Sequence, residues 1–161
     1  MVGLSMILFL SSCEKNRIYE ANVPIKNNTW DSNFTPSYTV DIRDTTLLYN
    51  LYVDVHHTEI YPFQNIWLLV TTRFPDSTKL SRRIEVMLAN DEGKWFGESL
   101  GEICDYRTLI QENAFFTKPG TYTFTFGQIM RQDELPGIMS IGIRVENTGI
   151  RKHSVTSSQN Y

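Results

Sequence analysis

Apolar and polar side chains alternate along much of this chain with a period of two residues. Such a period is typical of a β-strand that buries one face and exposes the other. The clearest case is residues 121–126, where threonine alternates with tyrosine or phenylalanine. The same alternation occurs at 49–56, 84–88 and 138–145, and a shorter case at 38–42. The pattern therefore predicts a series of short strands rather than helices.

Three further segments depart from this simple alternation. Residues 66–71 are largely apolar at odd and even positions alike, which predicts a central strand covered on both faces. Residues 95–98 are expected to form the second strand of a hairpin that turns at Gly93. Residues 101–116 have no clear period, so we expect irregular structure there, with a short helix or an edge strand at 106–110 as alternatives.

Glycine and proline turns separate these segments, and none of them has the spacing of a βαβ unit. About six to eight short strands of this kind predict an all-β chain folded as an antiparallel β-sandwich, of which the jelly roll is one form. We expect the sandwich to occupy residues 29–150. A polar tether at 13–28 is expected before it, and a flexible polar tail at 151–161 after it.

The N-terminal residues have the pattern of a bacterial lipoprotein signal. An apolar run at 2–9 leads into Leu-Ser-Ser directly before Cys13. The run is too short to span the ~30 Å of a bilayer's hydrocarbon core, and small residues before a cysteine suit a signal peptidase. We therefore expect residues 1–12 to be removed and Cys13 to carry the lipid that anchors the protein to a membrane of the cell envelope.

Composition and charge narrow the function. The chain has 15 Lys+Arg and 18 Asp+Glu, a formal net charge of -3, and its basic residues are scattered among acidic ones. This distribution argues against nucleic acid as a partner. With Cys13 lipidated, Cys104 has no disulfide partner and is expected to be a small buried residue. The chain contains no nucleophile elbow, no zinc-protease helix motif and no phosphate loop, so we expect no enzyme activity and no cofactor.

The strand at 49–56 supplies the candidate functional residues. Asn50, Tyr52, Asp54 and His56 occupy its even positions, which predicts one outward strip of polar and aromatic side chains. Such a strip suits recognition of a protein partner, with a simple solvated strand face as the alternative. A metal site is not expected, because His57 points to the opposite face and only two ligands remain, fewer than the usual three or four.

Blocks spread over nearly the whole chain resemble the GldH gliding-motility lipoproteins of the Bacteroidetes. The resemblance implies a lipoprotein associated with the gliding machinery and with the protein-secretion system linked to it, in a family without an assigned chemical activity. It implies other envelope proteins as partners, no small-molecule substrate, and a location on the periplasmic or outer-membrane face. The blocks are 49–55, 57–58, 61–62, 65–68, 93–97, 101–103, 119–124, 130–131, 135–138 and 142–146.

The alternative function is that of a surface module that binds glycans. Aromatic faces stack on sugar rings, and the chain offers Trp30, Trp67, Trp95, Tyr52 and Tyr61 for this purpose. Packing in the core and at turns is the competing explanation for the tryptophans. Coplanar exposed aromatics would favour glycan binding, whereas an exposed apolar patch would favour a protein partner.

Overall fold

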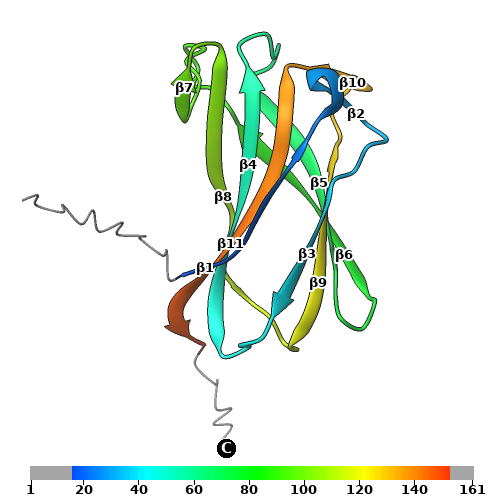
Figure 1. Ribbon diagram of the computed structural model, residues 1–161, viewed down its shortest axis with the longest axis vertical. Coiled ribbons are helices and arrows are strands. Elements are labelled where there is room, and N and C mark those ends of the chain that lie inside the picture. The colour runs from blue at the N-terminus through cyan, green and yellow to red at the C-terminus, as the bar shows by residue number, and fades with distance from the viewer. Residues whose placement is uncertain (1–15, 153–161) are drawn as a thin grey trace, which may run out of the picture.

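The structure, a computed structural model that describes residues 16–152, consists of two antiparallel sheets that face each other across one apolar core (Figure 1). A short 3-10 turn, η1 (Lys26–Asn28), connects the first two strands. The strands are β1 (Arg17–Pro24), β2 (Thr29–Asp31), β3 (Ser37–Ile42), β4 (Leu47–Thr58), β5 (Asn65–Arg73), β6 (Lys79–Met87), β7 (Glu98–Leu100), β8 (Ile103–Phe115), β9 (Gly120–Gln128), β10 (Glu134–Pro136) and β11 (Ile138–Arg151).

The order of the strands is that of a jelly roll. One sheet has the order β1-β11-β4-β8-β7 and the other the order β3-β9-β5-β6, while β10 and β2 form a small ladder of their own. The chain crosses repeatedly from one main sheet to the other, so that strands distant in sequence become neighbours, as β1 and β11 do in Figure 1. The predicted antiparallel β-sandwich is therefore confirmed. The described residues include no helix long and apolar enough to cross a membrane.

The core forms where the predicted inward faces meet. On β9, Tyr122, Phe124 and Phe126 are all buried, in agreement with the alternation in the sequence. The inward residues of β4 and β11, including Val53 and Ile143, lie in the same cluster. Burial of apolar surface at these positions holds the two sheets together.

The expected tether at 13–28 is wrong for residues 17–24, which form β1 and pair with β11. Tyr19, Ala21 and Val23 pack against the core, whereas the residues between them face outward. The sandwich therefore begins at Arg17 instead of residue 29. At the other end β11 continues to Arg151, the first residue of the expected tail.

The expectation for residues 101–116, irregular structure with a possible short helix, is also wrong. Residues 103–115 form the long strand β8. Two register shifts interrupt its pairing with β4 near Gln111, and Asn113 has a φ of 51°. Such bulges add residues to one strand and move the following side chains to the other face. They interrupt the period of two in the second half of the strand, and in the first half the apolar residues Ile103 and Leu109 on the outward face obscure it.

Two smaller expectations, for the strands at 66–71 and 95–98, also differ from the structure. β5 is central, between β9 and β6, but it is covered on one face only, and Trp67 on its other face is 39% exposed. The expected strand at 95–98 is reduced to one bridge between Ala89 and Trp95. The chain then leaves β6, and β7 pairs with β8 on the opposite sheet.

Candidate functional site

The predicted strip lies on the outward face of the five-stranded sheet. Asn50, Tyr52, Asp54 and His56 alternate along β4 with residues that are buried in the core. β8 and β11 pair with β4 on either side. Charged side chains on these two strands therefore lie on the same face as the strip. The strip is therefore the centre of a larger surface rather than an isolated row.

Asp54 is not accessible to a partner, since only 2% of it is exposed. Its carboxylate binds Arg107 on β8 in a bidentate manner, with Oδ1 2.5 Å from Nε and Oδ2 2.9 Å from Nη2. On the other side it neighbours Gly142. A Cβ on that glycine would lie 1.9 Å from Oδ1 of Asn22, so the Asn22 side chain occupies the space above the glycine. Asp54 thus has a structural role within the face.

Glu20 on β1 extends this ion pair into a network. Its Oε1 lies 2.5 Å from Nη2 of Arg107, and its Oε2 lies 2.7 Å from Arg17 and 3.2 Å from Arg144. Burial by itself raises the pKa of Glu20, but hydrogen bonds from Arg17 and Arg107 and the nearby positive charges outweigh this effect and lower it. Arg144 also pairs with Glu146. The network connects four neighbouring strands, β1, β11, β4 and β8, at one level of the sheet.

The accessible part of the strip is formed by Tyr52 and His56. The imidazole of His56 remains partly exposed, and its Nδ1 lies 2.9 Å from Asp105 on β8. The hydroxyl of Tyr52 accepts a weak hydrogen bond of 3.4 Å from the side-chain amide of Asn50. The Oδ1 of Asn50 in turn accepts a hydrogen bond from the backbone N–H of Asn113. These side chains offer hydrogen-bonding groups and a ring edge to solvent, as recognition of a protein surface requires.

An exposed aliphatic end, which we define as Ile60, Leu100 and Ile103, continues the strip where β4 ends. Leu100 is 86% and Ile60 70% exposed. Leu100 and Ile103 are paired across β7 and β8, and Ile103 pairs with Thr58 at the end of β4. β7, the start of β8 and the end of β4 lie at the same end of this sheet (Figure 1), and Ile60 follows β4 by two residues.

Acidic residues surround the aliphatic end. Glu59 and Glu102 are exposed and joined by a backbone hydrogen bond of 3.0 Å between N of Glu59 and O of Glu102. Glu98 is exposed opposite Asp105. The alternation in the sequence does not reveal this end of the sheet, because it predicts no strand at 103–115, and only the pairing of that strand places Leu100 and Ile103 beside the end of β4. An apolar centre with a charged rim is the usual composition of a protein interface.

His57 is separated from His56, as the alternation requires. It is fully buried on the core side, where its ring centroid lies 4.6 Å from that of Trp95. Its Nδ1 lies 3.1 Å from the carbonyl oxygen of Thr58. Burial lowers the pKa of His57, although that hydrogen bond and the charge of Asp105 oppose the effect. Within residues 16–152 no three His, Cys, Asp or Glu side chains are grouped closely enough to hold a metal ion.

The aromatic residues proposed for glycan stacking do not form a platform. Trp30 is buried and donates from Nε1 to the carbonyl oxygen of Phe34 at 2.8 Å. Tyr61 is buried as well, with its hydroxyl bonded to Asn65. Trp95 is partly buried against His57. Core and turn packing accounts for these three rings.

The two cysteines have different positions. Cys104 is a buried free thiol on the core face of β8, 3.2 Å from the hydroxyl of Ser99. Cys13, the expected site of lipidation, lies outside the described residues, as do the signal at 1–12 and most of the tail expected at 151–161.

Comparison with known proteins gives a consistent result. The model of the GldH lipoprotein family matches residues 17–145. A gliding motility lipoprotein GldH homolog of Christiangramia forsetii is 27% identical over 149 residues, which cover 88% of this chain and 91% of the relative. The gliding motility lipoprotein GldH of Flavobacterium johnsoniae is 25% identical over 146 residues, covering 86% and 90%.

Among solved structures, the VP2 subviral particle of infectious bursal disease virus is similar at 13% identity with a TM-score of 0.35. The match covers 89% of this chain but only 37% of the viral chain. A similarity this low carries no argument about function.

Proposed function

This chain belongs to the GldH lipoprotein family, and from that premise we propose that it is a non-catalytic interaction component of the gliding-motility apparatus and of the protein-secretion machinery linked to it. Members of the family are lipoproteins, so the protein is anchored at a membrane of the cell envelope. Its action in this proposal is binding to other envelope proteins rather than chemistry on a substrate.

The observation that carries the proposal is the aliphatic end with its acidic rim, continuous with Tyr52 and His56 on the same sheet face. Exposure of aliphatic side chains to water is unfavourable, and this free energy is recovered when a partner covers them. The rim of Glu59, Glu98 and Glu102 favours a partner with basic residues around an apolar depression. The buried Asp54 and its ion pairs keep the strands below this surface in register.

Two surface variants are expected to reduce partner binding without unfolding the domain. Leu100→Asp places a charge on the aliphatic end, and Tyr52→Ala combined with His56→Ala truncates the strip. Both changes are at side chains that solvent reaches, so the melting temperature should remain nearly constant. Cross-linking in intact cells followed by mass spectrometry should show partner recovery reduced by about tenfold for Leu100→Asp and less for the double variant.

Ile150→Asp is the matched control, because Ile150 is an exposed aliphatic residue at the far end of β11. It should retain every cross-link. If both surface variants fold and also retain every cross-link, the binding surface lies elsewhere on the protein. If recovery of the cross-linked partner instead depends on added glycan, the protein is a glycan-binding module. Turnover of a substrate that point changes abolish would refute the non-catalytic role.

Cys13 is proposed as the lipidated residue. Cys13→Ser should abolish incorporation of an alkyne-labelled fatty acid, whereas Cys104→Ala should retain it because Cys104 is a buried thiol in the sandwich. Labelling in living cells, detected by click chemistry on the immunoprecipitated protein, measures both. Label that persists in Cys13→Ser would place the lipid on another residue.

A further inference from the structure

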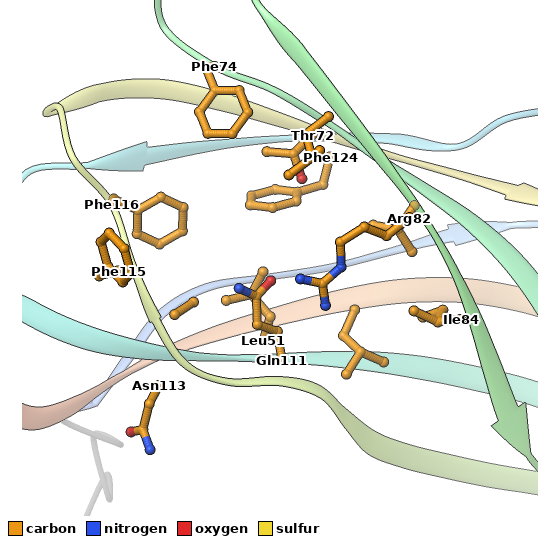
Figure 2. A pocket seen from close by; sticks show the side chains of 14 residues that line it. Leu51, Thr72, Phe74, Arg82, Ile84, Gln111, Asn113, Phe115, Phe116 and Phe124 are labelled. Atoms are coloured by element: carbon orange, nitrogen blue, oxygen red, sulfur yellow. The ribbon is translucent and has the colours of Figure 1, made fainter.

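The sandwich has an apolar cavity of about 290 Å³ between its two sheets, on the side where β6 and β8 face each other. Figure 2 shows phenylalanine rings at one end of this cavity and aliphatic side chains at the other. On the inward side of β6, Leu80 is 53% exposed and Arg82 is exposed as well, whereas Ile84 is partly buried and Val86 is buried. The two sheets are therefore not closed on this side. The lining residues include Leu51, Phe74, Ile84, Ile110, Phe116 and Phe124.

The backbone next to the cavity has a free edge. β6 pairs only with β5, in an unbroken register from Lys79 to Met87, and no described strand pairs with its other side. β8, across the cavity, pairs with β7 only at 103–105 and bulges near Asn113. A regular strand with one unpaired edge presents N–H and C=O groups to any extended chain that approaches it.

Among the residues that the structure describes, Arg82 is the one charged residue that lines the cavity. In Figure 2 its guanidinium points into the cavity, toward Leu51 and Gln111. Within residues 16–152 no acidic side chain lies close enough to form an ion pair with it. A guanidinium beside an apolar cavity favours a ligand that combines apolar groups with a carboxylate.

We propose that an extended segment of a partner protein adds to the free edge of β6 as a fifth strand of the four-stranded sheet. Alternate side chains of the segment are apolar and enter the cavity, and one inward acidic side chain pairs with Arg82. This mode of binding takes affinity from main-chain hydrogen bonds and specificity from side-chain pockets. The site is on a different part of the molecule from the aliphatic end and does not depend on the role proposed for that end.

The free edge favours a strand over a small anionic amphiphile. An amphiphile would satisfy the apolar cavity and Arg82 but would leave the backbone groups of β6 without partners. The cavity volume also lies at the lower limit of the ~300–1,000 Å³ typical of small-molecule sites. The cations of this edge, Lys79, Arg82 and Arg83, repel basic strands and discourage unspecific pairing, whereas an acidic strand is attracted.

Fluorescence anisotropy with defined peptides tests the proposal on the lipidated protein in phosphatidylcholine nanodiscs. The probe is an end-capped peptide of nine residues, the length of β6, with aspartate at position 5, valine at the other odd positions, and threonine or serine at the even positions. We expect saturable binding to the wild-type protein. Arg82→Glu should weaken it about tenfold, and a peptide with lysine in place of the aspartate should regain that loss on the variant.

Arg83→Glu is the matched control, since Arg83 is adjacent on β6 and does not line the cavity; it should change the affinity less than about twofold. A peptide with N-methylated backbone should lose binding, because it cannot donate to β6. Three results would overturn the proposal. The first is absence of saturable binding up to about 1 mM peptide, and the second is an equal loss of affinity for Arg82→Glu and Arg83→Glu. The third is undiminished binding of the N-methylated peptide, a result that would indicate a site for an amphiphile.

Discussion

Phe126→Ala is expected to lower the free energy of unfolding by about 3–5 kcal/mol. Phe126 is fully buried between the sheets, and its ring centroid lies 5.5 Å from that of Tyr38 on β3. Truncation removes the transfer free energy of the ring and leaves a cavity that neighbouring side chains on rigid strands cannot fill. Urea denaturation followed by tryptophan fluorescence measures the loss.

Thr125→Ala is the control for this prediction. Thr125 lies next to Phe126 but points outward, where its hydroxyl is 3.3 Å from that of Ser37. We expect a loss well under about 1 kcal/mol. Equal losses for the two variants would mean that the inward face of β9 is assigned incorrectly, and a helix-dominated circular dichroism spectrum would contradict the sandwich itself.

Arg107→Met is expected to lower the free energy of unfolding by about 3 kcal/mol, although it removes no core residue. Arg107 is the bidentate partner of Asp54, and Asp54 is buried. Methionine retains much of the aliphatic stem but leaves a carboxylate without its cation in a place that water hardly reaches. The penalty for such an unpaired buried charge exceeds the net contribution of the ion pair when it is intact.

A double-mutant cycle separates the penalty for the unpaired charge of Asp54 from the net contribution of the intact ion pair. Asp54→Asn together with Arg107→Met should be more stable than Arg107→Met alone, because the uncompensated charge is gone. Arg43→Met, which removes a pair with Asp41 on the exposed surface, should leave stability almost unchanged. If the double variant is no more stable than Arg107→Met, the ion pair does not determine the stability of this face.

The sequence was sufficient to predict the strands that bury one face and expose the other. β9 and β4 follow the alternation closely, and Tyr122 and Val53 lie where the period of two places them. β8 is not recognisable from the pattern, since bulges at Gln111 and Asn113 interrupt its second half and exposed apolar residues such as Leu109 obscure its first half. β1 has the composition of a tether because polar and charged residues such as Glu20 and Asn22 separate its few apolar ones, and only the partners of Glu20 show why that residue belongs in a sheet.

The candidate site also has features that follow from the sequence pattern and features that depend on the pairing of strands. The outward direction of Tyr52 and His56 follows from their spacing alone. The burial of Asp54 does not, because it results from Arg107 and Asn22, which come from strands far away in sequence. The aliphatic end and the cavity beside Arg82 depend entirely on which strands pair and on which edges remain free, and local patterns contain no information about either.

The position of β1 also determines how the protein would respond to mechanical force. Arg17 pairs with Glu146, far from the aliphatic end, whereas Pro24 pairs with Ser140 near the end of β4 (Figure 1). The lipid proposed for Cys13 would be four residues from Arg17, a reach of at most ~14 Å. Tension between the membrane and a partner at the aliphatic end would therefore act along β1 and shear it against β11. In this geometry the hydrogen bonds of the ladder share the load, instead of opening one after another.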